Sequence, residues 1–208
     1  MTRQVSVPVE RVARWLDGFA DRHGETLAEA DDLEVRLTGG DGARAGLTVP
    51  FPPLPEGAGD ARDRLLAHVS RPRNVGVLLV RRRAHAVGVF AGDDLVASKV
   101  DTSYVQATTK AGGWSQQRYA RRRANQAAAA FANASDAAAR VLLPYLAGLD
   151  ALVCGGDRAA VDAVLGDPRL RRLAELRTGP WLAVPEPRLR VLQATPAQFR
   201  AIRIWLDP

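Results

Sequence analysis

The residues best suited to chemistry lie in one stretch of the chain, TTKAGGWSQQRYARRRANQ, at residues 108–126. Gly112 and Gly113 carry no side chain and permit backbone angles that other residues avoid, so a loop tip built on them can enter a narrow cavity. Two side-chain amides, Gln116 and Gln117, follow closely. An amide donates and accepts hydrogen bonds but takes no proton at ordinary pH, so the chemistry that it suits is the positioning of a water molecule.

Basic side chains accompany this stretch. No acidic residue lies between residues 102 and 135, whereas five basic residues do: Lys110, Arg118, Arg121, Arg122 and Arg123. Spacings of three and four place the first three arginines on one face of a helix. Concentrated positive charge suits a polyanion, of which nucleic acid is the commonest, although a solvated basic face has the same pattern. Trp114 either stacks on a base or folds back as an apolar plug.

Other candidates for chemistry are weaker. No Cys or His pair has the spacing of metal ligands, so neither a metal site nor a cofactor is predicted. Gly155 and Gly156 stand between a predicted strand and a predicted helix, where they either hold an anion on backbone N–H groups or let the strand and helix pack closely. The run lacks the lysine of a P-loop and the GxGxxG spacing, which favours close packing. Cys154 ends an apolar run, so a buried thiol is favoured over a reactive one.

The elements around the glycine stretch follow from periodicity. Three extended apolar runs, at residues 74–82, 84–92 and 94–100, predict a meander of strands. The alanine-rich residues 115–143 contain neither Gly nor Pro and predict one long helix. The run LDALVCGG then predicts a buried strand, and DRAAVDAVL predicts a helix with Asp157 as its N-cap. The glycine stretch is therefore expected to be a loop between the meander and the long helix.

The flanking regions complete the predicted fold. Residues 8–23 have helical spacing and end before Gly24, residues 33–49 form a hairpin that turns at residues 39–42, and Asp60 caps a short helix. Residues 187–206 predict a strand and then a closing helix capped by Thr195. The fold class is α/β (mixed α+β), with a central mixed sheet flanked by helices. We expect residues 1–208 to form a single α/β domain, in which residues 1–70 are an N-terminal extension (helix, hairpin, helix) and residues 71–208 are the core.

Bulk composition limits the class of protein. The chain has 208 residues, 47% of them hydrophobic, which is enough for a packed core, and a net charge of +6. No apolar run approaches the roughly 18 residues that a membrane span needs, and the N-terminus lacks the apolar run of a secretory signal. A single cysteine cannot form an intramolecular disulfide. The expected location is the cytoplasm, with no membrane partner.

The segment GGWSQQRYARRR resembles the catalytic loop of archaeal and eukaryotic class-1 peptide-release factors, whose motif runs Gly-Gly-Gln-Ser, two residues, Arg, an aromatic residue, Ala and Arg. The matching residues are Gly112, Gly113, Ser115, Arg118, Tyr119, Ala120 and Arg121. The order of predicted elements over residues 74–175 also agrees with that catalytic domain. Trp114 stands where the classical factors have the catalytic glutamine. A glutamine displaced past the serine is similar to the VMS-type release-factor-like peptidyl-tRNA hydrolases, which include a bacterial VLRF branch.

This resemblance implies a function. It implies a codon-independent peptidyl-tRNA hydrolase of ribosome quality control, with Gln116 as the catalytic glutamine and Gln117 as the second candidate. The partners it implies are peptidyl-tRNA and the large ribosomal subunit, with rRNA contacted at the peptidyl-transferase centre. RNA-binding roles would fall to Trp114 and the basic residues Lys110, Arg118, Arg121, Arg122 and Arg123. Two alternatives remain open: a ribosome-binding protein without catalysis, and a tRNA nuclease.

Overall fold

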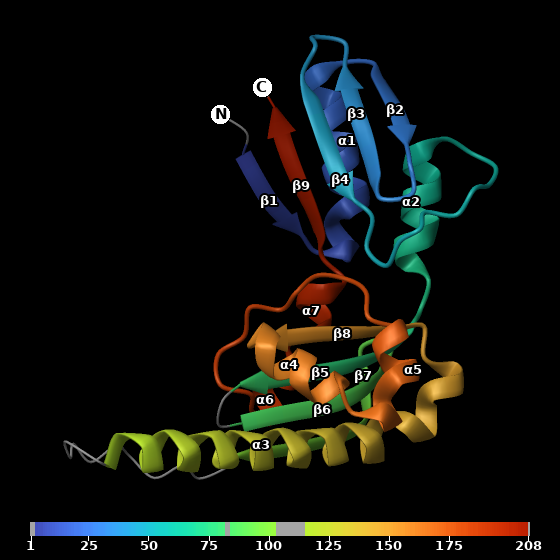
Figure 1. The fold of residues 1–208 in the computed structure, drawn as a ribbon. Coiled ribbons are helices and arrows are strands. Elements are labelled where there is room, and N and C mark those ends of the chain that lie inside the picture. The colour runs from blue at the N-terminus through green and yellow to red at the C-terminus, as the bar shows by residue number, and fades with distance from the viewer. Residues whose placement is uncertain (1–2, 82–83, 103–114, 208) are drawn as a thin grey trace. The chain divides into compact units, whose positions relative to one another are not determined.

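A computed structural model describes residues 3–81, 84–102 and 115–207 of the chain (Figure 1). The chain divides into two compact units, one formed by Met1–Pro72 with Pro196–Pro208 and the other by Arg73–Thr195. This division differs from the expected single domain with a core over residues 71–208. The second unit begins close to the expected boundary, but residues 196–208 belong to the N-terminal unit, because the last strand of the chain pairs there.

The N-terminal unit contains a five-stranded sheet in the order β1-β9-β4-β3-β2, and each of its neighbouring pairs is antiparallel. The strands are β1 (Arg3–Val7), β2 (Thr26–Ala30), β3 (Glu34–Gly39), β4 (Arg44–Thr48) and β9 (Ile202–Asp207). The predicted hairpin is confirmed as β3 and β4. The closing helix predicted after Thr195 is wrong in extent: α7 (Pro196–Phe199) is one turn long, and β9 follows because Ile202 and Ile204 alternate into the core.

Helices pack on this sheet through one core. They are η1 (Val9–Arg11), α1 (Val12–His23) and α2 (Ala61–Ser70). Leu16 and Phe19 of α1 share a core cluster with Leu47 and Ile204 of the sheet. The predicted end of α1 is confirmed at Gly24, whose φ is 77°. The predicted cap of α2 is also confirmed, because the Asp60 carboxylate accepts a hydrogen bond from the Asp63 N–H at 2.9 Å.

The second unit is built on a four-stranded mixed sheet in the order β7-β6-β5-β8. The predicted meander is confirmed as β5 (Asn74–Arg81), β6 (Ala84–Ala91) and β7 (Asp94–Thr102), which pair antiparallel. The strand β8 (Ala151–Gly156) lies parallel to β5. This mixed sheet confirms the predicted fold class.

Helices cover both faces of the mixed sheet. One face packs on the long helix α3 (Ser115–Leu142) and on α4 (Arg158–Leu165), as Ala138 and Val161 share a cluster with Leu78 and Val87. On the other face, α6 (Leu189–Gln193) packs against β6, where Leu192 lies against Gly88. A strand was predicted for this last segment. It is wrong because the backbone closes a helical turn here, in which the N–H groups of Leu192 and Ala194 donate to the carbonyls of Arg188 and Arg190.

Shorter helical turns complete the second unit. They are η2 (Leu143–Gly148), η3 (Pro168–Leu170) and α5 (Arg171–Glu175). The long helix predicted over residues 115–143 is confirmed by α3. Among the described residues no helix is both long and apolar enough to cross a bilayer.

Candidate functional site

The long helix α3 begins at Ser115, immediately after the Gly-Gly-Trp stretch. Four candidate residues lie outside the described residues: Lys110, Gly112, Gly113 and Trp114. Six others fall in the first turns of α3, where the backbone is described and their side chains are not: Gln116, Gln117, Arg118, Arg121, Arg122 and Arg123. The structure therefore brings both glutamines and four arginines to the N-terminal end of a single helix.

The C-terminal half of α3 is the part that anchors the helix. Ala134, Ala137 and Ala138 are buried against the sheet, and their small side chains let the helix approach it closely. The Ser135 hydroxyl donates a hydrogen bond to the Val164 carbonyl of α4 at 3.2 Å. This half holds the helix in one orientation.

Residues near the middle of α3 reach the surface: Gln126, Ala128 and Ala129 are exposed. Figure 1 shows the start of α3 extending past the ends of β5 and β6. With 28 residues the helix is about 42 Å long at 1.5 Å per residue. It can thus act as a rigid stem that carries its first turns away from the body of the unit.

The start of α3 is electropositive. The first backbone N–H groups of a helix have no partner within the helix, and the helix dipole is positive at this end. The first turn contains no acidic residue that would neutralise it, and arginines occupy positions 118 and 121–123. Such an end attracts phosphates and stabilises negative charge that develops nearby.

A buried histidine lies on the sheet face that supports α3. His85 of β6 pairs with Val80 of β5 and with Asp101 of β7, and it alternates onto the same face as Val87. Its side chain is 4% exposed, and its Nε2 has no hydrogen-bond partner among the described residues. Burial lowers the pKa of His85, so its neutral form is favoured.

The glycine pair after β8 serves packing. A Cβ on Gly155 would stand 2.6 Å from the Leu182 carbonyl oxygen, and one on Gly156 would stand 2.2 Å from that of Val80. The Gly156 N–H donates to Leu182, and the Asp157 N–H donates to Val80. These N–H groups already donate hydrogen bonds to backbone carbonyls of the fold. The close-packing interpretation is therefore supported over an anion site. The predicted N-cap is confirmed, since the Asp157 carboxylate accepts from the Ala160 N–H.

Cys154 is a buried structural thiol, as predicted. It lies in β8 with 2% of its surface exposed, and burial raises its pKa to about 12. A thiol of that kind carries almost no thiolate at neutral pH. No group of three or more His, Cys, Asp or Glu side chains that could hold a metal is found within the described ranges.

Comparison with known proteins agrees with this geometry. The family model described as "Actinobacteria/chloroflexi VLRF1 release factor" (acVLRF1) matches residues 73–205. A comparison with curated proteins found no match. Among solved structures, the Vms1 mitochondrial localization core has a TM-score of 0.50 at 9% identity, over 93% of this chain and 80% of that one. This similarity shows that the chain and the Vms1 core share a fold.

Two archaeal structures are also similar. The archaeal translation termination factor aRF1 has a TM-score of 0.47 at 16% identity, over 96% of this chain and 66% of that one. A chain described as "Archaeal protein" has a TM-score of 0.42 at 16% identity, over 96% and 67%. This chain thus spans about two thirds of the length of both.

The Gly-Gly motif ahead of α3 and the family match together define a protein of the release-factor class. The match covers more than half of the sequence, and the chain belongs to the family of actinobacterial and chloroflexi VLRF1 release factors.

Proposed function

We propose that this chain is a codon-independent peptidyl-tRNA hydrolase of the cytoplasm, which releases nascent peptides from tRNA on stalled large ribosomal subunits during ribosome quality control. One observation carries the proposal: a Gly-Gly motif stands directly before the arginine-rich start of a long helix, in a chain of a release-factor family. The anchored half of α3 would hold this end at a fixed distance from the body of the unit.

The reaction is hydrolysis of the ester that joins the peptide to the terminal ribose of tRNA. A water molecule must be held near the carbonyl carbon, and charge that develops on the carbonyl oxygen must be stabilised. The Gln116 amide would position the water. Because an amide takes no proton, proton transfer would fall to the ribose hydroxyl and to ribosomal RNA. The protein then supplies part of a composite active site, which needs neither a metal nor a cofactor.

The helical start of α3 bears on which of the two glutamines positions the water molecule. Consecutive helical positions point about 100° apart, so we assign the water to one of the two glutamines. Gln116 is the first choice, because it stands nearer to the Gly-Gly tip. Gln117 is the alternative.

Binding of RNA would come from the same segment. Lys110, Arg118, Arg121, Arg122 and Arg123 would neutralise phosphates of rRNA or tRNA near the peptidyl-transferase centre. Trp114 would stack on a base. Gly112 and Gly113 would let the tip enter a space too narrow for side chains.

The direct experiment measures release of labelled peptide from peptidyl-tRNA on isolated large subunits. We expect release without any codon in place and with intact tRNA. Binding to the subunit without release would instead identify a ribosome-binding protein that performs no chemistry. Cleaved tRNA would identify a nuclease.

A further inference from the structure

A tryptophan and two arginines form a cluster in the second unit, away from the α3 motif in sequence. The guanidinium carbon of Arg158 lies 4.4 Å from the centre of the Trp181 ring, and that of Arg177 lies 5.3 Å from it. Both distances are within the range of cation–π attraction. The cluster joins the first turn of α4 to the segment that follows α5.

This cluster is held in place by the fold. Residues 177 and 182 form parallel bridges with β8, so Trp181 stands in a segment fixed along that strand. The indole N–H donates a hydrogen bond to the Gly156 carbonyl at 3.2 Å. Arg177 forms an ion pair with Asp162 at 2.7 Å. The ring and its two cations are therefore preorganised, which lowers the entropy lost when they bind a ligand.

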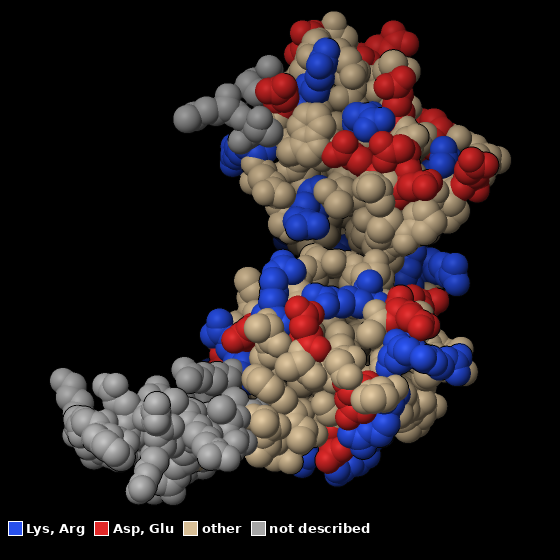
Figure 2. Space-filling view, in the orientation of Figure 1, with Lys and Arg blue, Asp and Glu red and all other residues tan. Residues whose placement is uncertain are grey.

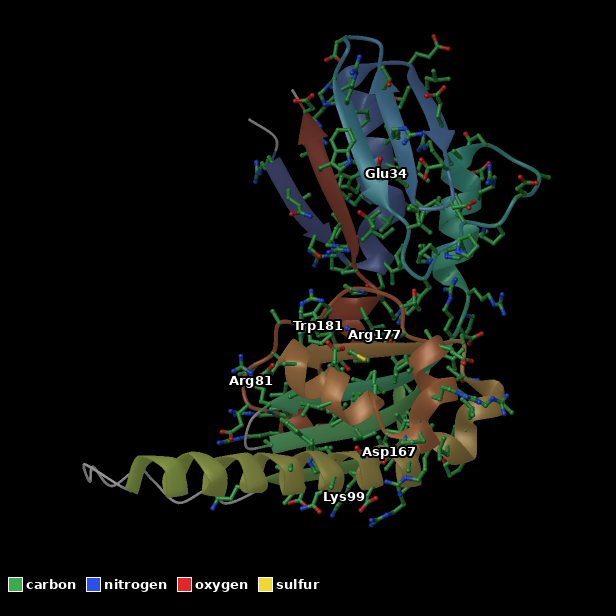
Figure 3. All side chains as sticks on the ribbon, viewed as in Figure 1. Glu34, Arg81, Lys99, Asp167, Arg177 and Trp181 are labelled. Carbon is green, nitrogen blue, oxygen red and sulfur yellow. The ribbon has the colours of Figure 1, made fainter. Side chains whose placement is uncertain are left out.

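A third arginine lies beside them. Arg81 is exposed at the end of β5, and its Cγ lies 3.2 Å from the position that a Cβ on Gly156 would occupy. Figure 3 shows Arg81, Trp181 and Arg177 on the second unit. Arg81 ends β5, and Arg177 bridges Leu152 near the start of β8. No carboxylate among the described residues forms an ion pair with Arg81 or Arg158.

Charge is distributed unevenly between the two units. The second unit carries 18 basic and 10 acidic residues, a formal charge of +8, while the N-terminal unit carries 11 and 13, a formal charge of −2. Figure 2 shows basic side chains interspersed with a few acidic ones over the visible face of the second unit. The positive charge of the chain thus belongs to the unit that also carries α3.

We propose that Arg81, Arg158, Arg177 and Trp181, the Trp181 surface, bind backbone phosphates of ribosomal RNA as a second contact, separate from the α3 motif. The guanidinium fork matches phosphate oxygens in a bidentate geometry, and stacking on the indole fixes the orientation of the fork. This inference rests on the proposed function in one respect, namely that the partner is the large ribosomal subunit. Its role is binding rather than catalysis.

The test compares RNA binding by the native chain with that of Arg158→Ala/Arg177→Ala. The matched control is Arg140→Ala/Arg172→Ala, which removes two exposed arginines of the same unit, one on α3 and one on α5. We measure affinity for purified large subunits over a series of salt concentrations. For two lost phosphate contacts the slope of log K against log salt should fall by roughly 1.5, and affinity at low salt should fall by about tenfold or more. The control should keep the native slope.

A second variant separates binding from folding. Arg158 is exposed at the start of α4, so Arg158→Gln should keep the native melting temperature while lowering the slope by about 0.7. Unchanged affinity and slope in both variants would overturn the proposal that the Trp181 surface binds RNA, even if the chain releases peptide. If the native chain binds subunits through these arginines but releases no peptide, RNA binding by the Trp181 surface is supported and the hydrolase function is contradicted.

Discussion

The carbonyl oxygen of Val80, at the end of β5, accepts a hydrogen bond of 2.8 Å from the backbone N–H of Asp157, which caps α4. This bond closes the junction where β8 turns into α4. Gly156 stands directly before the cap with φ of 92°, and a Cβ there would be 2.2 Å from the same Val80 oxygen. The turn therefore requires glycine for two reasons, the left-handed backbone and the lack of space.

Replacing this glycine should destabilise the second unit. We expect Gly156→Ala to lower the free energy of unfolding by about 1–3 kcal/mol from backbone strain, and by more if Val80 must shift. Gly148→Ala is the control, because nothing lies within 4 Å of a Cβ there, and it should change stability by less than about 0.5 kcal/mol. Denaturant unfolding measures both. Equal midpoints for the two variants would contradict the close contact.

His85 should make the second unit sensitive to acid. Burial is the main cause that lowers the pKa of His85. The negative charge of Asp101 acts in the opposite direction and raises the pKa, while the positive charge of Lys99 lowers it further. The unfolded chain therefore binds a proton that the folded chain resists, so stability is retained above the ordinary value of 6.5 and is lost as the pH falls below it. His85→Leu should show a smaller loss of melting temperature between pH 7.5 and 5 than the native chain. Parallel losses would exclude His85 as a source of the acid sensitivity.

Cys154 should resist alkylation while the chain is folded. With a pKa of about 12 and little exposure, it carries almost no accessible thiolate at pH 8. A thiol reagent should label it only after denaturant unfolds the second unit. Because the folded-state pKa lies above the ordinary 9.0, stability should also decrease as the pH rises above 9. Rapid labelling of the native chain would show that β8 opens readily.

Side-chain bulk at the Gly-Gly tip should keep the tip out of a narrow cavity. Gly113→Val should reduce peptide release on the order of 100-fold, because a misplaced tip cannot bring the amide to the ester. The melting temperature should stay native, since residue 113 precedes α3 and the buried alanines that anchor that helix begin at Ala134. Full release by this variant would remove the requirement for a narrow tip.

Local signals were sufficient to predict most elements of the second unit. Extended apolar runs predicted β5 to β7, the absence of Gly and Pro predicted α3, and Asp157 predicted the start of α4. The final strand was misassigned because Thr195 and Pro196 are typical of a helix start, while the partners of β9 are β1 and β4, far away in the sequence. The same distance explains why β1, which pairs with β9, was not predicted. The edge strand β2, which pairs with the adjacent β3, was also missed.

The Trp181 surface could not be predicted from the sequence, for a related reason. Residues 81, 158, 177 and 181 have no common spacing, and only the folding of β5, β8 and the segment after α5 brings them together. In contrast, the Gly-Gly stretch is a contiguous motif, so its candidate residues could be proposed from the sequence. Their roles stay predictions, because those side chains lie outside the part of the chain that the structure describes.

The most direct measurement compares peptide release by the native chain, Gln116→Ala and Gln117→Ala on isolated large subunits charged with labelled peptidyl-tRNA. We expect Gln116→Ala to slow release on the order of 100- to 1000-fold with subunit binding unchanged, while Gln117→Ala keeps most of the activity. Native release by Gln116→Ala would contradict the assignment of the catalytic glutamine, and absence of release by the native chain would contradict the hydrolase itself.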